Sequence, residues 1–66
     1  MSIFKIQMDA LREKLAEGGI DRPLLIKSLR KVRMAAINEG DKAGIAFFDA
    51  PVEVMADRML AERKKK

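Results

Sequence analysis

The chain contains no cysteine and no histidine, and this limits how a protein of only 66 residues can hold its fold together. A chain of this length buries only about 60% of the surface that its unfolded form exposes, so its hydrophobic core is marginal. Small proteins usually compensate with disulfides, a structural metal or association with another chain. Disulfides are excluded here, and a zinc site lacks its usual ligands. We therefore expect a single small domain over residues 1–66 that forms a homo-oligomer, most simply a homodimer, without a metal or other cofactor.

The composition narrows the class of protein further. Hydrophobic residues make up 48% of the chain, which is enough for a packed core and argues against disorder. No apolar run approaches the roughly 18 residues that are needed to span a bilayer. The first residues also lack the basic and then apolar pattern of a secretory signal. We expect a cytoplasmic protein without a membrane partner.

Three segments show the apolar spacing of three and four residues that is typical of amphipathic helices. We predict helices over about 2–17, 22–38 and 50–63, followed by a basic tail at 64–66. Ser2, Asp21 and the Asp49-Ala50-Pro51 segment are suitable helix starts, whereas Gly18-Gly19 and Gly40 are suitable ends. The predicted core stripes are Phe4, Met8, Leu11 and Leu15, then Leu25, Leu29, Val32 and Ala36, and finally Val52, Met55, Ala56, Met59 and Leu60. The expected fold is an all-α, homo-oligomeric bundle of two to three short helices.

Two segments allow more than one conformation. Phe4, Ile6 and Met8 alternate with polar residues, so residues 3–8 also fit a half-buried strand. Residues 41–48 could form a helical turn, continue the second helix or act as an extended hinge. With the strand option, residues 3–36 resemble the ribbon-helix-helix family of dimeric DNA-binding repressors. That resemblance implies that Lys5 and Gln7 read the major groove, although the first helix is about one turn shorter than in the family.

A second resemblance covers only residues 43–52. The stretch Ala43-Gly44-Ile45-Ala46-Phe47, with Pro51-Val52, is similar to part of the theta subunit of bacterial DNA polymerase. It implies no functional residue here.

The sequence contains few of the side chains that enzymes use for catalysis. Without His, Cys, Tyr and Trp, the usual nucleophiles and general bases reduce to Ser, Lys and carboxylates. Ser28 lies beside Lys27 and Lys31 in a helix, but nothing in the sequence builds a pocket around it. We therefore interpret Ser28 as a surface serine. The sequence predicts a non-catalytic protein without a small-molecule substrate.

Two other patterns have structural explanations. Glu53, Asp57 and Glu62 could form a hard-metal site, but their helical spacing equally describes an exposed face. Gly18-Gly19 precedes a helix, as in phosphate-binding loops, but further glycines and a following Lys-Ser or Lys-Thr are missing. We interpret it as a turn between helices.

The basic central helix is the most informative feature. Residues 21–39 carry five basic residues against two acidic ones, in a chain of net charge +4. Lys27, Arg30 and Lys31 share one stripe, with Arg22 and Arg33 on its flanks. Such a stripe can neutralise several phosphates; the alternative is a solvated face that pairs with nearby acids. No aromatic residue lies in this helix, which disfavours recognition of single strands.

The third helix and the segment before it suggest another kind of partner. Methionine-rich faces adapt well to the surfaces of other proteins. The predicted oligomer or partner interface consists of Phe47, Phe48, Val52, Met55, Met59 and Leu60. The sequence thus predicts a small regulatory protein that binds macromolecules, with nucleic acid as the favoured ligand. The alternative is a protein-protein interaction module that inhibits a larger host protein.

Overall fold

The computed structural model describes residues 3–64, and in this range all regular secondary structure is helical. There are four helices, so the prediction of an all-α fold is confirmed, whereas the expected number of two to three is too low by at least one. The helices are α1 (Ile3–Glu17), α2 (Arg22–Glu39), α3 (Lys42–Phe47) and α4 (Val52–Lys64). Ser2 and residues 65–66 of the basic tail lie outside the described residues.

Glycines end the first two helices in the same way. Gly18 and Gly40 adopt left-handed φ angles of 78° and 67°, which a residue without a side chain adopts at little cost. At the end of α1, Gly18 N–H donates to Leu15 O and Gly19 N–H donates to Lys14 O, both at 3.1 Å. Residues 36–41 repeat this pair of hydrogen bonds at the end of α2. These Schellman motifs satisfy carbonyl groups that a helix end leaves free, and they confirm both predicted helix ends.

Aspartates begin the second and third helices. The Asp21 carboxylate accepts a hydrogen bond from Leu24 N–H at 3.1 Å, and Pro23 occupies the first turn of α2. Asp41 accepts from Ala43 N–H and Gly44 N–H at 3.1 and 3.2 Å. Each carboxylate thereby satisfies amide donors that have no partner within the helix. The start of α2 is as predicted, whereas α3 is a short additional helix.

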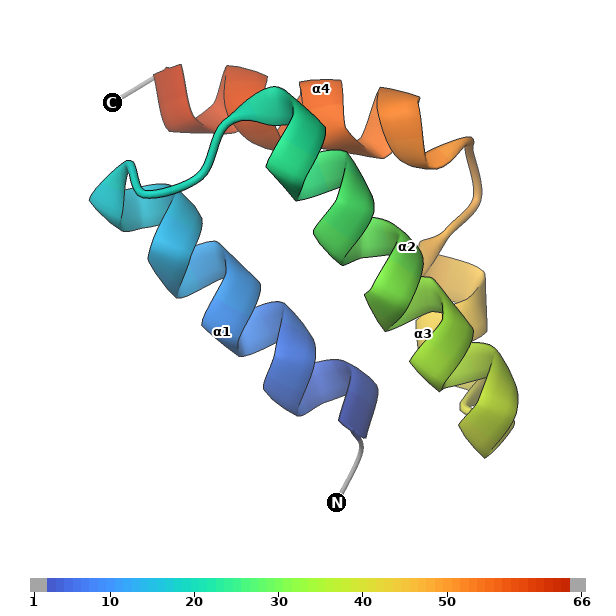
Figure 1. The fold of residues 1–66 in the computed structure, drawn as a ribbon. Helices are drawn as coiled ribbons and strands as arrows, with labels where there is room; N and C mark the ends of the chain where they lie inside the picture. The colour runs from blue at the N-terminus through green and yellow to red at the C-terminus, as the bar shows by residue number, and fades with distance from the viewer. Residues whose placement is uncertain (1–2, 65–66) are drawn as a thin grey trace.

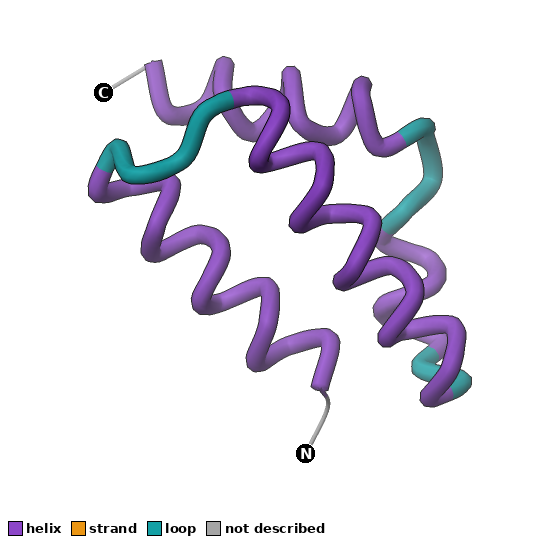
Figure 2. Tube along the Cα trace, viewed as in Figure 1, coloured by secondary structure: helices purple, strands orange, loops and turns teal. Residues whose placement is uncertain are grey.

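The helices are joined by short connections and fold back on one another. Figure 1 shows α1 and α2 as an antiparallel hairpin, with α3 beside the end of α2. Helix α4 then crosses the opposite end of the hairpin, near the α1–α2 turn. Figure 2 shows how little of the chain is loop. At the open end, Ile3 N–H donates to the Glu39 carboxylate at 3.1 Å and ties the start of α1 to the end of α2.

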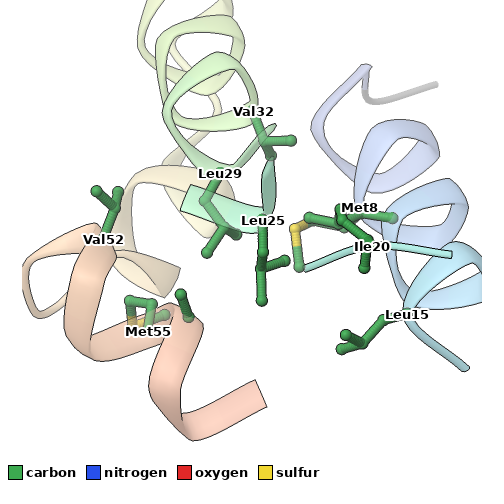
Figure 3. Packing of buried hydrophobic residues seen from close by; sticks show 10 residues of the cluster. Met8, Leu15, Ile20, Leu25, Leu29, Val32, Val52 and Met55 are labelled. Atoms are coloured by element: carbon green, nitrogen blue, oxygen red, sulfur yellow. The ribbon is translucent and has the colours of Figure 1, made fainter. Parts of the chain in front are cut away.

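The core forms where α1, α2 and α4 meet. In Figure 3, Leu25 and Leu29 of α2 lie between Met8 and Ile20 on one side and Met55 on the other. Both leucines are fully buried. The buried members of the predicted stripes are Met8, Leu11, Leu15, Leu25, Leu29, Val32, Ala36, Val52, Met55 and Ala56, whereas Phe4, Met59 and Leu60 are half-buried. The three stripes therefore form one core.

Helix α3 packs closely through a glycine and an aromatic cluster. A Cβ atom on Gly44 would lie 2.7 Å from the Ala36 Cβ and 2.9 Å from the Phe4 Cγ, both too close for real contacts. Phe4 also contacts Phe47 and Phe48, with ring centroids 5.7 and 6.2 Å apart. Among the open alternatives for residues 41–48, the structure has a separate helix followed by a turn.

The strand alternative for residues 3–8 is wrong, because α1 is helical from Ile3 onward. Phe4, Met8, Leu11 and Leu15 can all face the other helices only with helical spacing. Core packing therefore decides against the strand that the short alternation allows. The resemblance to ribbon-helix-helix repressors required a strand in this segment, so the structure does not support it. Lys5 and Gln7 lie on a helix, and the role in reading bases that the resemblance implied for them no longer applies.

Candidate functional site: a lysine face and an apolar groove

Two of the five predicted basic residues form ion pairs with α4. Arg22 Nε donates to Asp57 Oδ1 at 2.8 Å, and Arg30 NH2 donates to Glu53 Oε1 at 3.0 Å. The hydrogen bond from Arg22 holds the pKa of Asp57 below its ordinary value. The pKa of Glu53 is also lowered, first by its own backbone N–H and then by Arg30. These pairs link α2 to α4 and reduce the charge that Arg22 and Arg30 offer to a ligand.

The same ion pairs engage two of the three carboxylates that could have formed a metal site. Asp57 and Glu53 are directed to arginines, and Glu62 lines a different part of the surface. Among the described residues, no group of three or more potential ligands is close enough to hold a metal ion.

The remaining lysines of α2 lie on a different side of the helix, away from α4. Lys27 and Lys31 line a shallow hollow along the outer face of α2, together with Arg30 at its edge. Lys31 also lines a notch of about 200 Å³ between α1 and α2, opposite Lys14. We call Lys14, Lys27 and Lys31 the lysine face. Its lysines come from both helices of the hairpin, and Lys31 lines both hollows.

The lysine face carries groups that suit an anionic ligand. None of its three lysines forms an ion pair within the described part of the chain. Among the described residues, no aspartate or glutamate lines either hollow. Gln7, Ser28 and Asn38 line them and add neutral hydrogen-bonding side chains. Phosphate oxygens accept hydrogen bonds from such side chains as well as from lysine.

The structure therefore divides the predicted basic stripe. It brings Lys27, Arg30 and Lys31 together, but Arg22 is directed to α4. Arg33 lines another hollow, which it shares with Asp49 and Glu53. Lys14 also lines this surface, although it was not among the predicted site residues. Its position three residues after the core residue Leu11 was the available signal, but the sequence does not specify how α1 lies against α2.

A second surface feature is a groove of about 610 Å³ between α1 and α4. Leu15 and Ala16 of α1 line one side, and Met55 and Met59 of α4 line the other. Phe47 also lines it. Four charged residues complete the groove, namely Arg12, Asp49, Arg58 and Glu62. Its balanced charges distinguish it from the lysine face, whose hollows are also partly apolar but carry only basic charges among the described residues.

The predicted interface residues do not all meet at this groove. Phe47, Met55 and Met59 line it. Phe48 and Val52 line the hollow beside Arg33 instead, and Leu60 packs against the core. Phe4, which does not line the groove, contacts Phe47 and Phe48, and the helical spacing alone did not indicate these contacts.

No helix in the described range combines the length and the apolar character that a membrane span requires. No protein-family model, curated protein or solved structure matches the chain.

Proposed function

We propose that the chain is a small, non-catalytic regulatory protein that binds duplex nucleic acid through the lysine face. The observation that carries this proposal is that three lysines without ion-pair partners among the described residues line two adjoining hollows of α1 and α2, and that no described acidic residue lines either hollow. Lysines that contact phosphates release condensed counterions, and this release drives sequence-independent binding. We expect the protein to act in the cytoplasm, as a homodimer.

The geometry favours phosphates over base edges as the atoms that are contacted. Lys27 and Lys31 lie one turn apart on α2, and Lys14 projects from the neighbouring helix. Three cationic side chains on two helices can contact several phosphates along the backbone of a duplex. No aromatic residue lines either hollow, so stacking on unpaired bases has no platform among the described residues. We therefore expect duplexes to be bound with little sequence preference.

The first prediction concerns salt dependence. Each phosphate contact contributes about 0.9 to the slope of log affinity on log salt for duplex DNA, so three lysines give a slope of about −3. Affinity should fall roughly 40-fold between about 50 and 200 mM salt. Fluorescence anisotropy with a labelled duplex measures both values. The double variant Lys27→Gln, Lys31→Gln should reduce the slope to about −1 and weaken binding to all duplex sequences alike.

A matched control separates the lysine face from general positive charge. Lys42 is exposed at the start of α3 and lines neither hollow of the lysine face. Lys42→Gln removes the same charge as Lys31→Gln, but it should leave the slope nearly unchanged. Charge reversal at Arg30 is less informative, because it would also place a carboxylate beside Glu53. If wild-type protein retains no duplex at low salt, or if the two single variants behave alike, the lysine face is not a nucleic-acid site.

A further inference from the structure

We infer that the groove between α1 and α4 is the interface of a two-fold symmetric dimer, and that a second copy of this chain fills it. The groove is lined by apolar side chains from both helices, among them Leu15, Met55 and Met59. Leu15 and Met55 are already buried in the single chain, whereas Phe47 and Met59 are half-buried and Ala16 is exposed, so a partner that covers the groove buries apolar surface of these three residues. This burial would supplement the marginal core of a chain of 66 residues. The identity of the occupant follows from the charges around the groove.

The charged residues of the groove are two arginines and two acids, Arg12, Arg58, Asp49 and Glu62. This sum of zero differs from the net charge of +4 for the chain. A polyanion would be repelled by the acids, and a purely apolar partner would bury Arg12 and Glu62 without ion-pair partners from the described part of the chain. A second copy offers the same four charges in reverse order. The groove is therefore complementary to itself, as a two-fold interface requires.

Helix α4 shows how the charges can pair. Arg58 and Glu62 are four residues apart and lie on the groove side of the helix, on either side of Met59. When two α4 helices pack antiparallel about a two-fold axis, Arg58 of each copy faces Glu62 of the other. The Met59 side chains of the two copies then lie near the axis. Each ion pair occurs twice, because the axis repeats it.

The groups that this arrangement needs are accessible in the single chain. Glu62 and Arg12 form no ion pair with the rest of the described residues. Arg58 pairs with Asp49 at 3.4 Å, and the two side chains are 57% and 69% exposed. An exposed pair of this kind contributes little stability, so Arg58 can exchange it for Glu62 of a second copy at small cost. The groove shares no residue with the lysine face, so the dimer leaves both lysine faces uncovered.

Charge reversal tests the interface. Sedimentation equilibrium of the wild-type chain should give twice the chain mass of 7.4 kDa. Arg58→Glu places two acids of each copy against two acids of the other, so this variant should be monomeric. Glu62→Arg places two arginines of each copy against two arginines of the other, so this variant should also be monomeric. Circular dichroism should show that both variants remain helical.

Mixing the two variants is the decisive experiment. In the mixture, the two acids of the Arg58→Glu chain face the two arginines of the Glu62→Arg chain, so a heterodimer should form although neither variant dimerises alone. Substitutions that merely damage the monomer cannot produce this rescue.

A wild-type chain that stays monomeric overturns the inference and leaves the groove to a helix of another protein. It is also overturned if Arg58→Glu remains dimeric or if the mixture stays monomeric. The inference rests on the homodimer of the proposed function, but duplex affinity of the Lys27→Gln, Lys31→Gln variant has no bearing on these outcomes, so the interface and the proposed nucleic-acid binding fail separately.

Discussion

At the scale of single residues, Gly44 determines how closely α3 approaches the hairpin. Its φ angle is not in the left-handed region, so the glycine is required for space and not for backbone conformation. A methyl group there would meet Ala36 Cβ at 2.7 Å and Phe4 Cγ at 2.9 Å. The Ala36 side chain is fully buried and has no room to move. The sequence offers no signal for this role, because a glycine within a helix is usually a weak point.

The Gly44→Ala variant tests this packing, because the sign of its change in unfolding free energy depends on how tightly α3 packs. Helix propensity alone would stabilise α3 by about 1 kcal/mol, because alanine is the better helix former. Overpacking in a filled core costs about 1–3 kcal/mol, and we expect it to prevail. Chemical denaturation followed by circular dichroism measures the change in unfolding free energy. Gly19→Ala is the control, since its nearest neighbour would lie at 3.8 Å. A gain in stability from Gly44→Ala would show that α3 packs less tightly.

Leu24 and Leu29 allow a matched test of the core. Both lie in α2, but Leu29 is fully buried, whereas Leu24 is 48% exposed. Truncating Leu29 to alanine leaves a cavity between α1 and α4, so the variant should lose about 3 kcal/mol of stability. Leu24→Ala should change stability by less than about 0.5 kcal/mol. Urea unfolding of both variants provides the comparison. Equal losses would mean that the stripe of α2 is oriented differently.

At the scale of elements, α2 and α4 are held together by the core and also by the pairs Arg22–Asp57 and Arg30–Glu53. The pKa values of Asp57 and Glu53 are lowered in the folded chain. Groups with a lowered folded pKa stabilise the fold above their unfolded pKa of about 4. This contribution is lost as the pH falls through the folded pKa. Acid should therefore loosen α4 from α2.

Asp57→Asn tests that pH dependence. The variant removes the carboxylate that accepts from Arg22, so its stability should fall less steeply than that of the wild type below about pH 4. The melting temperature between neutral pH and about pH 3 is the measurement. Glu13→Gln serves as the control, because Glu13 is exposed and forms no ion pair among the described residues. Identical slopes for all three chains would show that the pair contributes nothing to folding.

The elements also show which parts of the fold could be predicted from the sequence. The stripe Leu25, Leu29, Val32 and Ala36 is long and regular, and Asp21 and Gly40 mark its ends, so α2 was predicted to within one residue. Helix α3 has only six residues, too few for a periodic pattern, and it depends on the Asp41 cap. The pairing of Arg22 and Arg30 with α4 depends on how the helices cross, which the spacing within each helix does not contain. For this reason the lysine face differs from the predicted stripe.

At the scale of the whole molecule, the two candidate surfaces differ in net charge. The charged residues that line the hollows of the lysine face are all basic among those described, whereas two arginines and two acids line the groove on the α4 side. Net charge attracts a polyanion over long distances, whereas balanced charges select a partner at contact. We therefore propose that one surface binds nucleic acid and that the other associates with a second copy. We expect variants on one surface to leave the activity of the other unchanged.

The dependence of stability on concentration links this association to the fold itself. If the groove between α1 and α4 completes a marginal core, folding and dimerisation are coupled, and the melting temperature must rise with protein concentration. For two chains of this length, a tenfold increase should raise it by roughly 5 °C, given the usual unfolding enthalpy per residue. Arg58→Glu should melt lower and at a temperature that no longer depends on concentration. Scanning calorimetry at several concentrations measures both. A wild-type melting temperature that is constant with concentration would show that the monomer is stable without its second copy.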